Sequence, residues 1–150
     1  MSVPASLQAA VGTWSGTNQL FLPGEPTRES ESTLTVALAA QGKFCTIAYS
    51  WAFEGEPQDG LMVIGSNEEQ VVTAWIDSWH MGDQMMQCEG QVDVNGAIVV
   101  RGSYKVEGHP DWGWRMVVAS TSDALRIEMY NVTPDGQEML GVEATYSRAG

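Results

Sequence analysis

Strand-like segments separated by short turns are the feature that most constrains this chain. From Gly12 onward the sequence divides into about ten segments rich in Val, Thr, Trp, Tyr and Ile. They lie at 12–22, 31–40, 43–54, 59–66, 70–80, 84–93, 97–106, 113–121, 124–133 and 137–148. The clearest turn runs from Thr133 to Gly136, where Pro134 presets a negative φ and Gly136 accepts a positive one. Consecutive strands without crossover helices predict an antiparallel meander.

The unpaired edges of such a meander indicate which overall architecture it forms. A long meander leaves two exposed edges unless it closes on itself. We therefore predict an all-β protein, a closed antiparallel up-and-down barrel of about ten strands. A two-sheet sandwich is the alternative, although it would need longer Greek-key connections. Before the barrel, Pro4 to Val11 is predicted to form a short helical turn that Gly12 ends. The polar stretch from Pro23 to Ser32 is predicted to be a loop, and 150 residues fit one domain over 1–150.

Charge and cysteine content narrow the class of protein. Seven Lys and Arg against 19 Asp and Glu give a net charge of −12. Nucleic acid and anionic membrane are therefore not expected partners, since both need clustered basic residues. The first residues lack a basic and apolar leader pattern, so a secretory signal is not expected unless the chain is already mature. Cys45 and Cys88 are expected to be buried free thiols, a disulfide being the alternative. These features predict a cytoplasmic location.

Three segments resemble a known family. Gly12, Trp14 and Gly16 form a G-x-W-x-G pattern, which resembles the opening of calycin, or lipocalin-like, barrels. There the Trp plugs the closed end and the first Gly lets the chain turn. The central Trp75-Ile-Asp77-Ser78-Trp79 segment and the C-terminal stretch from Met129 to Arg148 resemble a bacterial family of single-domain lipocalin-like proteins of unknown function. The resemblance implies the barrel and no particular activity.

The resemblance raises the possibility of a bound haem. Haem-binding relatives in this barrel class share the opening pattern and need a His near the C-terminal end as the iron ligand. This chain has only His80 and His109. We therefore expect no haem, and no cofactor at all. Two histidines among scattered carboxylates are not a metal-binding pattern either, so no metal is expected.

Asp77 is the first candidate site residue. It shares an alternating face with Trp75 and Trp79, and periodicity does not decide whether that face lines the interior. If it does, Asp77 is a polar group in an aromatic box that could orient a ligand or act as a base. The alternative is a structural anchor that bonds an Arg or backbone amides. A ligand contact predicts that Asp77→Asn changes affinity and spares folding, whereas an anchor predicts unfolding.

The C-terminal hairpin supplies the second candidate. Counting from the Thr133 to Gly136 turn, the face of Leu125, Ile127 and Met129 meets that of Glu143. Glu143 would then point inward as a ligand contact or acid–base group, although a one-residue register error reverses the assignment. A structural partner of an Arg is the alternative.

Basic residues and His80 complete the candidates. Arg101, Lys105, Arg115 and Arg126 form a local basic cluster, which would either bind a carboxylate or phosphate or form a salt-bridged outer face. His80 lies at a strand end with Asp83 close behind. An Asp–His pair at a barrel mouth could act as a general base.

Function follows from the cavity that a wide barrel encloses. The chain has six Trp and eight Met, which make large and adaptable apolar surfaces. We predict an intracellular carrier or sensor for a small, mostly apolar or amphipathic molecule in a cavity of a few hundred Å³. The predicted ligand-binding residues are Trp51, Trp75, Asp77, Trp79, Met129 and Glu143. The alternative is an enzyme acting on a hydrophobic molecule in the same cavity, with Asp77, His80 or Glu143 as base. A third possibility is a filled barrel that forms a homodimer through an outer apolar patch.

Overall fold

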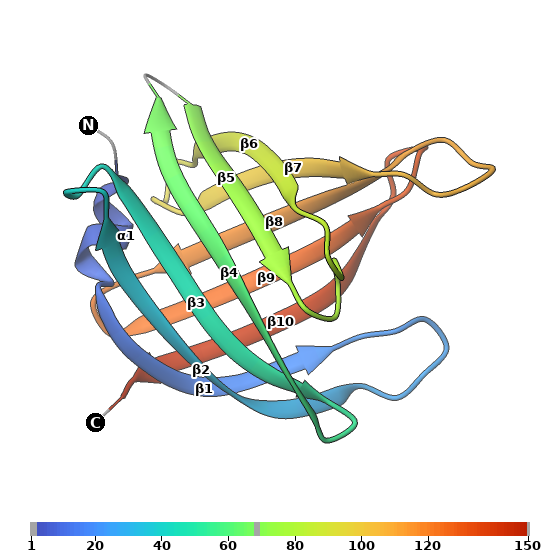
Figure 1. The fold of residues 1–150 in the computed structure, drawn as a ribbon, viewed down its shortest axis with the longest axis horizontal. Coiled ribbons are helices and arrows are strands. Elements are labelled where there is room, and N and C mark those ends of the chain that lie inside the picture. The colour runs from blue at the N-terminus through green and yellow to red at the C-terminus, as the bar shows by residue number, and fades with distance from the viewer. Residues whose placement is uncertain (1–2, 68–69, 150) are drawn as a thin grey trace.

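The computed structural model describes residues 3–67 and 70–149. These residues form one short helix and ten strands (Figure 1). The elements are α1 (Ala5–Ala9), β1 (Gly12–Leu20), β2 (Arg28–Ala39), β3 (Phe44–Phe53), β4 (Glu56–Asn67), β5 (Gln70–Asp77), β6 (Met86–Val92), β7 (Ile98–Tyr104), β8 (Trp112–Ser120), β9 (Ala124–Val132) and β10 (Glu138–Arg148).

Every strand pairs antiparallel with its neighbours in the chain, and β1 also pairs with β10. The sheet is therefore a closed barrel, which confirms the predicted fold class. Closure leaves no strand edge unpaired, and this is the physical reason that a meander of ten strands forms a barrel. Figure 1 shows α1 at one end, which we call the closed end. The β1–β2 and β7–β8 connections extend from the other, open end.

Three contacts seal the closed end. Leu7 of α1 is fully buried, and the Trp14 indole N–H donates to the carbonyl of Ala10 at 2.9 Å. The Arg148 guanidinium stacks 4.3 Å over the Trp14 ring and donates to the Ala9 and Val11 carbonyls, both at 2.7 Å. The carbonyls at the C-terminal end of α1 thus receive donors that the helix itself cannot provide.

Large side chains fill the barrel interior. Inward positions alternate with outward ones along each strand, as on β3, where Cys45, Ile47, Tyr49 and Trp51 are buried. Both cysteines are free and buried, as predicted, and burial raises the pKa of each thiol to about 11. Among the described residues, no helix is long and apolar enough to cross a membrane.

Two local expectations were wrong. The Pro23 to Ser32 stretch is strand from Arg28 onward, because Leu20 pairs with Arg28 and the charged Glu29 and Glu31 occupy the solvent face. Glu143 points outward, because a β-bulge between Leu140 and Val142 adds a residue to β10. The bulge reverses the faces of everything after it, so that Val142 and Ala144 are buried.

Candidate functional site

A cavity of about 740 Å³ opens at the open end of the barrel. We call it the mouth cavity. Its walls come from the end of β1, the β5–β6 connection and the ends of β7, β8, β9 and β10. Most of its lining is apolar, aromatic or thioether: Leu20, Phe21, Leu22, Trp75, Trp79, Met81, Met85, Met86, Tyr104 and Trp114. The remaining lining residues are His80, Gln84, Ser103, Lys105, Asn131 and Gly141.

The floor of the mouth cavity is an imidazole among indoles. The His80 ring lies 4.9 Å from the Trp79 ring, 5.5 Å from Trp51, 5.6 Å from Trp114 and 5.7 Å from Trp75, measured between centroids. Trp75 and Trp114 stack nearly parallel at 5.4 Å. Among the described residues, neither ring nitrogen of His80 has a hydrogen-bond partner. The ring can therefore donate to or accept from a bound molecule.

His80 also borders a second, much smaller space inside the barrel. This void measures about 10 Å³ and is lined by Asn18, Tyr49, Trp51, Asp77, His80, Ile127, Met129, Val142, Ala144 and Tyr146. A space of that size holds about one water molecule. The expected ligand-sized cavity thus lies at the mouth, because Trp and Tyr side chains fill the interior.

Asp77 accepts four hydrogen bonds and is 2% exposed. Its Oδ1 accepts the backbone N–H groups of Trp79 and His80, both at 2.8 Å. Its Oδ2 accepts the Tyr49 hydroxyl at 2.6 Å and the Trp51 indole N–H at 3.3 Å. The carboxylate thereby fixes the turn that follows β5, and with it the positions of Trp79 and His80. This geometry fits the structural-anchor alternative for Asp77. Both carboxylate oxygens already accept two hydrogen bonds each, which disfavours a role as a base.

Burial sets the protonation state of His80. Desolvation among the indoles lowers its pKa from the ordinary value of 6.5, and the nearby Asp77 charge opposes this only in part. The folded protein therefore holds the imidazole neutral at pH values where the unfolded chain already binds a proton. Asp83 does not form the expected Asp–His pair, since no hydrogen bond or ion pair joins it to His80 among the described residues.

We expect this difference to make folding stability depend on pH. The contribution of His80 is complete above pH 6.5 and declines as the pH falls from 6.5 toward the lower pKa of the folded state. Urea unfolding of the wild type between about pH 7.5 and 5.5 should show this decline. His80→Gln should flatten the slope, whereas His109→Gln should keep it, because His109 is exposed. Equal slopes in all three proteins would contradict the expectation.

The predicted site residues fall into three places. Trp75, Trp79 and His80 line the mouth cavity. Trp51, Asp77 and Met129 lie one layer deeper and border the water-sized void. Glu143 lies on the outer face, opposite Gln19 and Glu128 on the neighbouring strands, so that the expected inward position was wrong. Whether any of these residues contacts a ligand stays a prediction.

Sequence reasoning missed much of the mouth wall. Leu20 to Leu22, Gln84, Ser103 and Tyr104 were not singled out, although they line the cavity. One signal was available: in a meander that starts at the closed end, every odd strand ends at the open end. Strand ends there that remain apolar, such as Leu20-Phe21-Leu22, have no reason to be so unless they face a cavity.

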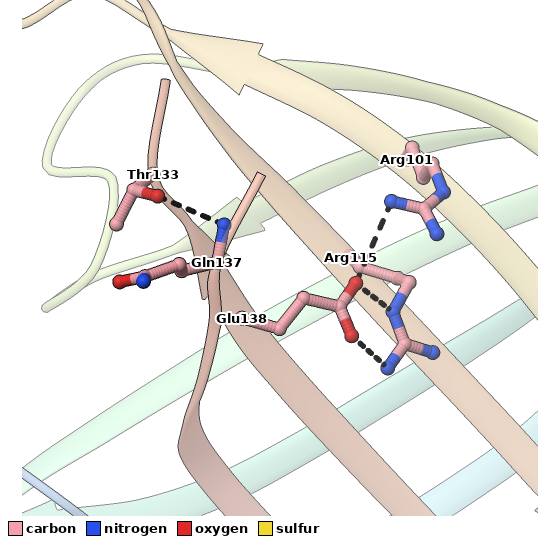
Figure 2. Close-up of polar contacts among 5 residues, drawn as sticks. All are labelled: Arg101, Arg115, Thr133, Gln137 and Glu138. Carbon is pink, nitrogen blue, oxygen red and sulfur yellow. Dashed lines mark hydrogen bonds and ion pairs between the residues drawn. The ribbon is translucent and has the colours of Figure 1, made fainter. Parts of the chain in front are cut away.

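Three members of the basic cluster, Arg101, Arg115 and Arg126, form ion pairs on the outer face, as one of its two alternatives predicted. The fourth member, Lys105, lies at the mouth cavity instead. Arg101 of β7 and Arg115 of β8 are directly opposite each other. Figure 2 shows the Glu138 carboxylate of β10 in contact with both guanidinium groups. Arg115 binds it through two hydrogen bonds of 2.7 and 2.8 Å, and Arg101 lies 3.6 Å away. Hydrogen bonding to Arg115 lowers the pKa of Glu138 and raises that of Arg115. These two guanidinium groups are thus already paired. Among the described residues, no group of three His, Cys, Asp or Glu side chains is arranged to hold a metal ion.

Fold and cavity together define a closed ten-strand β-barrel protein with a pocket at its open end. The model of the family described as "Protein of unknown function (DUF1579)" matches residues 3–148, and the chain belongs to that family. No curated protein matches the chain.

One solved structure shares the fold, and a second gives a weaker match. The crystal structure of Rv2717c from M. tuberculosis is similar with a TM-score of 0.67 at 14% identity, and the match covers 97% of this chain and 98% of that one. A protein of unknown function from the DUF3598 family of Nostoc punctiforme matches with a TM-score of 0.43 at 12% identity, over 95% of this chain and 48% of that one.

Proposed function

We propose that this protein binds a small, mostly apolar molecule in the mouth cavity. The observation that carries the proposal is a space of about 740 Å³ whose lining residues are mostly apolar, aromatic or thioether, with several polar residues among them. Small-molecule sites typically have this size and composition. The thioethers of Met81, Met85 and Met86 form an adaptable wall, which suits a ligand of irregular shape. An open mouth is also the arrangement that the lipocalin-like resemblance implies.

The role that fits such binding is that of a carrier or sensor inside the cell. Cys45 and Cys88 are buried free thiols, which is typical of proteins in a reducing compartment. We therefore propose a cytoplasmic location, with a free small molecule as the partner.

The neutral dye N-phenyl-1-naphthylamine tests the proposal, because its fluorescence rises in apolar surroundings. Wild-type protein should bind it, and Gly141→Leu should weaken binding at least about tenfold by filling the cavity. A Cβ at Gly141 meets only ordinary contacts, the nearest being Asn131 Nδ2 at 3.5 Å, so the backbone tolerates the change. Thr145→Leu, on the outer face of the same strand, is the matched control and should bind the dye as the wild type does. Equal binding by both variants would remove the mouth cavity as the site.

An enzyme is the second candidate, and the free ring of His80 is the observation that favours it. Asp77 already accepts four hydrogen bonds and Glu143 points outward, so His80 is the one general base left of the three candidates. This role requires that His80→Gln stop turnover of a bound molecule while dye binding persists. If dye binding is lost together with turnover, His80 acts in binding instead.

A further inference from the structure

The arginine side chains have protein partners, whereas two lysine side chains have none among the described residues. Arg28 pairs with Glu25 and Glu54, Arg101 and Arg115 share Glu138, and Arg126 lies 3.7 Å from Glu128. The Arg148 guanidinium donates to three backbone carbonyls. Within the described residues, Lys43 and Lys105 have neither an ion pair nor a side-chain hydrogen bond. Both are exposed and can be solvated by water, so only their surroundings distinguish them.

The two lysines differ in what surrounds them. Both lysines are exposed, but Lys43 lies on the β2–β3 turn at the closed end, whereas Lys105 follows β7 and is among the residues that line the mouth cavity. No carboxylate among the described residues lines that cavity. The neighbouring acids along the chain, Asp83 and Glu107, lie outside its lining. Among the described residues that line the mouth cavity, the exposed Lys105 at its rim is therefore the one with a permanent charge.

Asn131 adds a second donor to the same cavity. Its Oδ1 accepts the Tyr104 hydroxyl at 2.6 Å, which fixes the orientation of the amide. Its Nδ2 lies beside Gly141, another lining residue, and has no acceptor among the described residues. Gln84 and Ser103 add one amide and one hydroxyl, each of which can donate or accept, and no carboxylate stands among the described lining residues.

From this donor set we propose that the ligand is an amphipathic anion, a free molecule with an apolar body and one carboxylate or sulfonate group. The apolar body packs against the Trp and Met side chains, and the anionic group receives the Lys105 ammonium and the Asn131 amide. The inference rests on the proposed function and specifies its ligand. Charge-assisted hydrogen bonds of this kind are stronger than neutral ones. The net charge of −12 repels anions from the protein in general. Only an anion that also fits the apolar walls and reaches these two donors would then bind, which makes the cavity selective among anions.

Two dyes with nearly the same body separate this inference from the proposed function. In 8-anilino-1-naphthalenesulfonate, the N-phenyl-1-naphthylamine skeleton carries one added sulfonate. We expect the wild type to bind the sulfonate dye about tenfold more tightly than the neutral dye at physiological ionic strength. Lys105→Met should weaken sulfonate binding about tenfold and change neutral-dye binding less than about twofold. Lys105→Arg, which keeps the charge, should retain the preference, and Lys43→Met, which loses the same charge elsewhere, should behave as wild type.

The outcomes are distinguishable. If the neutral dye binds but the sulfonate dye binds no more tightly, the anionic ligand is excluded while the proposed function stands. The same holds if Lys105→Met and Lys43→Met have equal effects. If neither dye binds to the wild type, the proposed function fails and the inference fails with it.

Discussion

Asp77→Ala is expected to lower the free energy of unfolding by about 4 kcal/mol, measured by urea denaturation at neutral pH. The substitution leaves four donors without an acceptor: two backbone N–H groups, the Tyr49 hydroxyl and the Trp51 indole. Each buried donor left unpaired costs about 1–3 kcal/mol, and bonds to a charged acceptor lie at the upper end. The Tyr49 phenol stays protonated and able to donate, because burial and the adjacent carboxylate raise its pKa well above the ordinary value.

Asp77→Asn should cost less than Asp77→Ala, and the reason is geometric. The amide oxygen can still accept the N–H groups of Trp79 and His80, but the amide nitrogen then faces the Trp51 N–H, donor against donor. Asp83→Asn is the matched control, since this exposed aspartate in the same connection has no such bonds, and it should unfold as the wild type does. Near-wild-type stability of both Asp77 variants would contradict the anchor and restore Asp77 as a ligand contact.

The fold was predictable because its signals are local. Period-two alternation and turn residues such as Gly136, which has a φ of 94°, can be read within a few residues of sequence. Closure then followed from a general rule about strand edges rather than from any particular pair of residues. The loop predicted for Pro23 to Ser32 was wrong in its second half, because that prediction rested on the charge of Glu29 and Glu31. Acidic residues on the solvent face of a strand are compatible with strand pairing.

The site was less predictable because it depends on register and on distant connections. One extra residue at the bulge beside Gly141 turned Glu143 outward. An isolated Gly within a strand is compatible with a bulge, but it does not establish one by itself. The mouth wall combines Met86 of β6 and Tyr104 of β7, which lie on paired strands, with Leu20 of β1, which reaches them only when the barrel has closed. Aromatic content indicated a cavity, but the volume of those same side chains moved it from the interior to the mouth.

Gly16→Ala should destabilise the protein by more than about 3 kcal/mol, because β1 and β10 approach too closely at this position for any side chain. An added Cβ would lie 1.8 Å from the Thr145 carbonyl oxygen and 2.8 Å from the Tyr146 Cα. Both contacts are with backbone, so relief requires the pairing of β1 with β10 to shift, and this pairing closes the barrel.

The pairing of β1 with β10, which we call the seam, also supports a buried contact inside the barrel. The loss of stability should therefore exceed that of an ordinary overpacked side chain. The Tyr146 hydroxyl bonds Ser32 at 2.7 Å across β1, so a displaced β10 loses this buried contact as well. Gly141→Ala is the matched control on β10, where the added Cβ meets nothing closer than 3.5 Å, and its stability should stay within about 1 kcal/mol of wild type. Thermal melts followed by circular dichroism compare the two variants. Equal melting temperatures would mean that the two strands move apart at Gly16 at little cost. Gly16, the second glycine of the G-x-W-x-G pattern, would then not be needed for the close approach of β1 and β10.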